Sequence, residues 1–192
     1  MAHSTTRTPR CFGLVSAILA LTAVCARPEV ARADVHLSAE LAGALLFDEY
    51  SRETERWEAD AGITTAVAVG WEWRYRRWSF VPELAFGGGV FSDPYGRRVL
   101  HLAGGARIQW GTAFRPFVAL HVGWGFEEGV DGDAALEHRG LANDVSLGLA
   151  VPFDEHWSMA AQLTYRVLLA STGSGTEPTH WPGAGVSFAL RP

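Results

Sequence analysis

The segment Gly62–Trp73 reads GITTAVAVGWEW and decides the fold. Mostly apolar residues occupy one phase of a strict alternation: Ile63, Thr65, Val67, Val69, Trp71 and Trp73. Mostly small residues occupy the other: Gly62, Thr64, Ala66, Ala68, Gly70 and Glu72. A period of two is that of a β-strand, whose successive side chains point to opposite faces. The segment therefore predicts a strand with one apolar face.

The same alternation recurs along the chain and predicts eight strands, at residues 35–46, 62–73, 78–89, 98–110, 117–126, 141–153, 157–170 and 181–190. Longer connections, at 47–60, 91–97, 127–140 and 171–180, alternate with shorter ones at 74–77, 111–116 and 154–156. Long connections at one end and short ones at the other are typical of membrane-spanning barrels. The predicted fold class is all-β: an eight-stranded antiparallel up-and-down transmembrane barrel.

The N-terminal residues have the pattern of a signal peptide. Arg7 and Arg10 precede the uncharged apolar run Cys11–Cys25, which is shorter than the roughly 20 residues of a spanning helix. Residues 31–33, Ala-Arg-Ala, fit a small-x-small cleavage site. We expect a signal peptide over 1–33, cleaved near Ala33, and a barrel domain over 34–192; a lipoprotein cysteine at Cys25 and a retained N-terminal anchor are the alternatives. Both cysteines then lie in the signal segment, which leaves the barrel without thiol chemistry.

The composition of the non-apolar face indicates that it points inward. That face is mostly Gly, Ala, Ser and Thr with isolated charges, whereas a soluble surface carries about a quarter or more charged residues. A narrow eight-stranded interior has room for small side chains. The alternative is a soluble periplasmic barrel of the lipocalin type, which also alternates.

Aromatic residues gather beside the three short connections. We assign Trp71, Trp73, Trp78, Trp110, Phe117 and Trp157 to a membrane-interface ring on the apolar face, with Phe80 and Phe153 near them. Phe86, Trp124, Phe126 and Tyr165 lie toward the other ends of their strands. Two aromatic belts around an apolar band are typical of a barrel in a bilayer.

Two stretches carry a resemblance to a known family. Residues 115–125, RPFVALHVGWG, follow its turn-then-strand pattern, and residues 185–190, GVSFAL, are similar to its C-terminal assembly signal. Here Leu190 replaces the usual last aromatic residue, and Arg191 and Pro192 follow it. The chain thus resembles the small eight-stranded outer-membrane β-barrel superfamily, of the opacity-protein-like type. The resemblance implies the outer membrane of a Gram-negative bacterium, contact with its lipid, and insertion by the barrel assembly machinery; roles in this superfamily vary.

The charge of the chain is unsuited to nucleic acid. All its basic residues are arginine, and after residue 33 there are 12 of them against 20 acidic residues. Binding to a phosphate backbone requires clustered positive charge. The longer connections 47–60 and 127–140 are acidic, and we expect solvated surface loops. The alternative is a divalent-cation site made by Asp131 and Asp133 with Glu127, Glu128 or Glu137.

Isolated charges in the inward phase predict a polar network that closes the lumen: Glu40, Glu83, Arg107, His121, Asp144 and Arg166. Counting outward from the connection 154–156 places Asp144 opposite Arg166, and opposed side chains in a sheet are within reach of each other. Similar counting places Glu83 diagonal to Arg107, and Arg107 opposite His121. Charges in so narrow a space lose most of their water, and pairing is how they are tolerated.

Enzymatic and metal-binding functions are the remaining alternatives. His180, followed by Trp181, Pro182 and Gly183, with Ser158, Ser171 or Ser174, suggests a lipid A-modifying enzyme, although the pattern does not match a deacylase motif. His36, His101 and His121 share the inward phase, but a metal site requires them at one level of the barrel. We expect a non-enzymatic barrel without cofactor or metal, in a structural or surface-interaction role with an unidentified surface partner.

Overall fold

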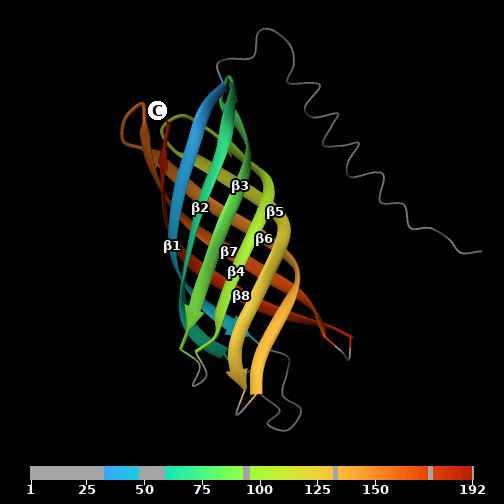
Figure 1. The fold of residues 1–192 in the computed structure, drawn as a ribbon. Helices are drawn as coiled ribbons and strands as arrows, with labels where there is room; N and C mark the ends of the chain where they lie inside the picture. The colour runs from blue at the N-terminus through green and yellow to red at the C-terminus, as the bar shows by residue number, and fades with distance from the viewer. Residues whose placement is uncertain (1–32, 48–58, 93–95, 132–133, 173–174, 192) are drawn as a thin grey trace, which may run out of the picture. The chain divides into compact units, whose positions relative to one another are not determined.

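The computed structural model describes residues 33–47, 59–92, 96–131, 134–172 and 175–191, and over these ranges the chain is a closed antiparallel barrel (Figure 1). Each strand pairs with the next, and the last pairs with the first. The strands are β1 Ala33–Phe47, β2 Ala59–Tyr75, β3 Trp78–Phe91, β4 Arg98–Trp110, β5 Arg115–Asp131, β6 Ala134–Pro152, β7 Trp157–Thr172 and β8 Gly175–Leu190. The predicted fold class is confirmed. The predicted signal peptide lies outside the described residues, apart from Ala33, and the described residues contain no helix able to cross a membrane.

Three tight turns define one end of the barrel, called here the short-turn end (top of Figure 1). Arg76, between β2 and β3, has φ 56°, and Gly111, between β4 and β5, has φ 114°. Between β6 and β7, the Asp154 carboxylate accepts hydrogen bonds from the backbone N–H groups of His156 and Trp157, both at 2.7 Å. These turns lie within the three connections predicted to be short.

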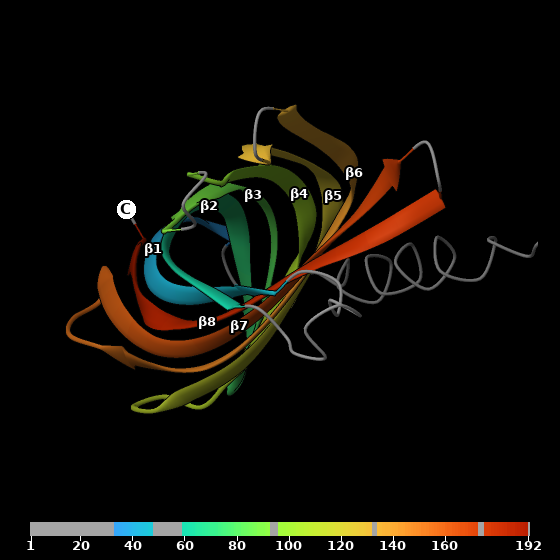
Figure 2. The ribbon, with the colours of Figure 1, turned by 90° about the horizontal axis from the view of Figure 1, so that it is seen from below.

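Two of the connections predicted to be long are mostly strand, which corrects the interpretation of residues 127–140 and 171–180 as loops. β5 continues to Asp131 and β6 begins at Ala134, so these two strands pair beyond their neighbours β4 and β7. β7 and β8 likewise pair as far as Thr172 and Gly175. Charged residues beyond the apolar band do not end a strand, since backbone pairing continues in water. Figure 2 shows the two extended hairpins diverging; we call this the extended end.

Two proline residues coincide with interruptions in the strand pairing. The β1–β8 pairing passes from Ala44–Gly183 directly to Phe47–His180, beside Pro182. The β2–β3 pairing passes from Gly70–Glu83 directly to Trp73–Phe80, beside Pro82. Proline has no N–H to donate to the neighbouring strand, so each interruption has a local cause.

The outer face of every strand carries large exposed apolar side chains, among them Leu41, Ile63, Leu84, Leu102, Val122, Leu147, Leu163 and Phe188. A continuous apolar exterior of this kind requires a bilayer, because water would not tolerate it. The alternative of a soluble lipocalin-like barrel does not fit this exterior.

Five of the six aromatic residues assigned to the interface ring point outward at the short-turn end. Trp71, Trp78, Trp110 and Trp157 are exposed, and half-buried Trp73 stacks on Phe80 with ring centroids 5.8 Å apart. Phe117 contradicts the prediction, because its side chain is 3% exposed and lies inside with Ala150 and Ala160. Its position in β5 is odd-numbered, in phase with Ala119 and His121 and out of phase with the outward Val118.

Candidate functional site

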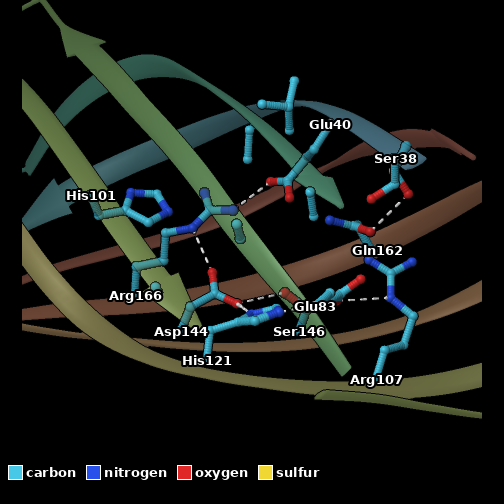
Figure 3. Close-up of a pocket in the computed structure, with 16 residues that line it drawn as sticks. Ser38, Glu40, Glu83, His101, Arg107, His121, Asp144, Ser146, Gln162 and Arg166 are labelled. Carbon is cyan, nitrogen blue, oxygen red and sulfur yellow. Dashed lines mark hydrogen bonds and ion pairs between the residues drawn. The ribbon is translucent and has the colours of Figure 1, made fainter. Parts of the chain in front are cut away.

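The lumen gathers the polar side chains that sequence reasoning singled out (Figure 3). On one side, Arg166 of β7 reaches two carboxylates: its Nε lies 2.6 Å from Asp144 Oδ2, and its Nη2 lies 2.7 Å from Glu40 Oε1. Its Nη1 donates to the hydroxyl of Thr64 at 3.2 Å, and Ser146 donates to Asp144 Oδ1 at 3.1 Å. One guanidinium therefore links β1, β2, β6 and β7 across the barrel.

His121 of β5 joins the two halves of this arrangement. Its Nδ1 lies 3.1 Å from Asp144 Oδ1 and its Nε2 lies 3.0 Å from Glu83 Oε1. Arg107 of β4 adds a contact from its Nε to the same Glu83 oxygen, at 3.3 Å. We call the six residues the central network: Glu40, Glu83, Arg107, His121, Asp144 and Arg166.

The number of hydrogen bonds that His121 must donate indicates the charge of the central network. Neutral imidazole donates through one nitrogen only, and ionised carboxylates only accept. Both contacts of His121 are satisfied when the ring is protonated. Two arginines and one imidazolium then match the three carboxylates, so the network is electrically neutral in a place where unpaired charge is costly.

The strand register explains which predicted pairs were right. Asp144 lies opposite Arg166, and Glu83 is diagonal to Arg107 because Arg107 lies opposite Val81; both predictions are confirmed. The predicted Arg107–His121 pair is wrong, since Arg107 lies opposite Ala119 and His121 opposite Gly105. The turn between β4 and β5 is centred one residue earlier than counting assumed, because Gly111 takes a positive φ and β5 already begins at Arg115.

Glycine at position 105 makes room for the network. A Cβ atom there would lie 2.7 Å from the His121 ring and closer still to the carbonyl oxygen of Leu120. Both distances are below any tolerable contact, so a side chain at this position would displace His121 from between its two carboxylates.

Toward the extended end, a buried apolar cluster fills the lumen. It includes the large side chains Leu46, Phe91, Val99, Leu168 and Trp181, all 2% exposed or less. We call the whole cluster the apolar plug: Ala44, Leu46, Phe91, Val99, Ala142, Leu168, Ala170 and Trp181. Sequence reasoning expected small residues inside the barrel and missed these.

A second ionic group lies inside the extended end, around Glu127, which is 0% exposed. Thr179 of β8 donates to Glu127 Oε2 at 2.9 Å, and Arg97 Nη1 lies 3.4 Å from Oε1. His138 Nδ1 of β6 is 3.7 Å from Oε2. Glu127 was interpreted as a solvated charge, and this is wrong: it continues the inward phase of β5, while Glu128 points outward.

At the short-turn end, the carboxylate of Glu72 is also 0% exposed. Its Oε2 lies 2.9 Å from Arg74 Nη2 and 2.6 Å from Arg191 Nε, and its Oε1 accepts from Ser79 at 2.7 Å. Deeper in, Arg107 lies over the buried Phe117 ring, 4.7 Å from its centroid. The lumen is thus occupied at several levels, and the space left around the central network is about 30 Å³, room for very few water molecules.

The metal-site alternatives find no support in the described geometry. His36, His101 and His121 are all buried, but only His121 touches carboxylates, and the described residues contain no cluster of three or more ligand side chains. Glu127, one of the ligands considered for a cation site at 127–137, points into the barrel interior and is not available to an external site. Asp133 and the side chain of Asp131 lie outside the described residues.

The residues considered for lipid A chemistry are likewise separated. His180 points outward, where its Nδ1 lies 2.8 Å from the Tyr165 hydroxyl. Ser158 is buried in the lumen near the opposite end, and the side chains of Ser171 and Ser174 are outside the described part. Within the described residues His180 has no hydrogen bond to a serine; its partner is Tyr165.

Comparison with known proteins supports the fold. No protein-family model matches the sequence, and no curated protein matches it either. Among solved structures, Neisserial surface protein A aligns with a TM-score of 0.66 at 10% identity, over 84% of this chain and 99% of that one. The attachment invasion locus protein Ail of Yersinia pestis and the outer-membrane enzyme PagL each align with a TM-score of 0.50, at 12% and 14% identity, over 82% of this chain and 99% of theirs.

These likenesses show the fold: the chain is a small eight-stranded barrel of the outer-membrane type. With its apolar exterior, such a barrel resides in the outer membrane of a Gram-negative bacterium and contacts membrane lipid. The matched structures include a surface protein and an enzyme, so the fold alone does not select an activity.

Proposed function

We propose that the chain is a non-enzymatic outer-membrane barrel whose closed, polar lumen serves stability and whose extended end faces the cell exterior and engages surface partners. The observation that carries the proposal is the filled lumen: the central network, the apolar plug and the Glu127 group occupy successive levels. Eight strands leave an interior that side chains can fill completely.

The extended end supplies the interaction surface. Glu128 and Glu137 are exposed there, on strands that pair beyond the rest of the barrel. Without the buried Glu127, segments 47–60 and 128–140 carry ten acidic residues against three arginines. An acidic surface of this kind favours partners with a basic face, and such attraction weakens as salt rises.

Orientation is tested by labelling intact cells with an impermeant maleimide. The chain after residue 33 has no cysteine, so a single introduced thiol reports its own position. Glu137→Cys at the extended end should label, and Arg76→Cys at the short-turn end should label only after the cells are broken. The reverse pattern would contradict the proposed orientation.

Partner chemistry is tested with a fluorescent oligo-arginine peptide and the barrel in phosphatidylcholine vesicles. Binding should fall several-fold in Glu128→Gln/Glu137→Gln and with added salt. Glu155→Gln, at the opposite end, is the matched control and should bind as the wild type does. Equal binding by all three proteins would refute an acidic interaction surface.

The absence of enzymatic activity is tested by mass spectrometry of lipid A from cells with and without the protein. Identical lipid A is expected. A change in acylation that depends on His180 would replace this proposal with the enzymatic alternative.

A further inference from the structure

Three arginine side chains converge at the short-turn end of the lumen. Arg74 continues the inward phase of β2, Arg115 opens β5 in that phase, and Arg191 follows the last residue of β8. Arg191 is fixed in place by its backbone, whose N–H donates to the His156 carbonyl at 2.8 Å. His156 Nδ1 in turn donates to the Arg191 carbonyl at 2.7 Å.

The acidic partners of these arginines are fewer than the arginines themselves. Arg74 and Arg191 share one oxygen of Glu72, whose other oxygen is taken by Ser79. Asp34 lies opposite Glu72 in the β1–β2 pairing and is the other acidic residue with a favourable electrostatic interaction with Arg191. Arg115 Nε donates a hydrogen bond to the carbonyl oxygen of Thr112, at 3.1 Å. We call the group Glu72, Arg74, Arg115 and Arg191 the arginine cluster.

Buried donors in this cluster lack acceptors. Arg191 is 4% exposed, yet its Nη2 has no hydrogen-bond partner, and neither has Arg74 Nε. Arg191 Nε is close to Glu72 but not aligned for a hydrogen bond. An unsatisfied buried donor on a charged group costs more than a neutral one. The cluster therefore has guanidinium N–H groups without acceptors inside the lumen at the short-turn end.

Electrostatics agree with this geometry. Burial, together with repulsion from Arg115 and Arg74, lowers the pKa of Arg191 to about 10, even though the Glu72 carboxylate opposes the shift. The existing carboxylates leave the positive charge incompletely compensated, and an additional anion would compensate it.

We propose that the arginine cluster is a binding site for a small free oxyanion of the phosphate or sulfate type. Planar guanidinium groups match such anions with paired, parallel hydrogen bonds. The ligand must be small, since Phe117 and the central network fill the lumen beyond the mouth. It must be free in solution, because inward-facing arginines are separated from the surrounding lipid by the barrel wall.

Phosphate binding to the full barrel in a non-ionic detergent tests the site, with titration calorimetry as the readout. The wild type should bind phosphate saturably at constant ionic strength, and chloride should not replace it. Arg191→Gln and Arg115→Gln should each weaken binding tenfold or more. Arg98→Gln, an exposed arginine at the extended end, should leave it unchanged. Gel mobility before and after boiling reports whether each variant is folded.

Glu72→Gln separates an anion site from a merely structural cluster. Removing the competing carboxylate should tighten phosphate binding several-fold, although it also removes an ion pair. Three results would overturn the proposal. They are a wild type that shows no saturable phosphate binding, an Arg98→Gln variant that loses as much affinity as the cluster variants, or folded Arg115→Gln and Arg191→Gln variants that bind as the wild type does. Displacement of phosphate by phosphatidylglycerol vesicles, but not by phosphatidylcholine vesicles, would assign the site to a lipid headgroup and overturn the free-anion claim.

Discussion

The central network and the apolar plug occupy the same lumen with opposite chemistry. The network holds three carboxylates, two arginines and a histidine in contacts between 2.6 and 3.3 Å. The plug consists of apolar side chains and depends on Leu46, Phe91, Leu168 and Trp181 filling the space. A polar layer is exacting about chemistry, because a buried charge without its partner is costly. An apolar layer is exacting about volume.

The largest difference between the two layers is expected for substitution of Arg166, in the central network. Arg166→Met should lower the free energy of unfolding by about 3–5 kcal/mol, since Asp144 and Glu40 lose their cation while remaining buried. Urea unfolding in vesicles, followed by gel mobility, measures the loss. Adding Asp144→Asn to Arg166→Met should recover part of it. A double variant less stable than the single one would argue against a buried unpaired charge as the cause.

The plug should respond to lost volume. Trp181→Ala removes a large, fully buried side chain and should cost about 3 kcal/mol or more through the cavity it leaves. Trp78→Ala, on the outer face, is the matched control and should cost less. Equal losses at the two positions would show that Trp181 is not packed as the structure has it.

A volume-conserving exchange sharpens the contrast. Leu168→Met keeps the side chain apolar and about the same size, and should cost less than about 1.5 kcal/mol. Methionine, expected to be damaging in place of Arg166, is thus expected to be mild two residues further along the same strand. Comparable losses from Leu168→Met and Arg166→Met would remove the distinction between the two layers.

The smallest expected effect is at the turn between β6 and β7, outside both layers. Two backbone hydrogen bonds, from Trp157 and His156, lower the pKa of the Asp154 carboxyl below its ordinary value. Its contribution to stability is therefore present above the unfolded pKa and is lost as pH falls through the folded pKa. Asp154→Ala should be slightly less stable than the wild type near neutral pH, with the difference vanishing in acid. Asp154→Asn, which keeps an acceptor oxygen, is the control.

Sequence reasoning predicted the polar layer better than the apolar one for a physical reason. Charges are rare in the inward phase, so Asp144 and Arg166 stood out, and the turn at Asp154 fixed their register. Leu46, Phe91 and Trp181 look like any other apolar strand residue, and they lie near strand ends where the phase is hardest to follow. Leu46 and Trp181 already lie in the inward phase of the predicted strands, and Phe91 lies one inward position past Gly89, so following that phase to each strand end would have found all three.

The same continuation would have found the charges at the two ends. Glu127 extends the inward phase of β5 by one position beyond Gly125, and Arg191 extends that of β8 beyond Ala189. Phe117 was assigned to the outer face because it is aromatic, although its odd-numbered position in β5 puts it in the inward phase with Ala119 and His121. The pairing of Arg107 was missed because alternation does not reveal where a turn is centred; the positive φ of Gly111 decides that.

The central claim, that the lumen is closed, is tested most directly by planar-bilayer recording of the wild-type barrel. The filled lumen predicts no steady conductance above that of the bare bilayer, across a range of voltages and salt concentrations. Large, steady, single-channel currents that require correctly folded protein would contradict a lumen closed by the central network and the apolar plug.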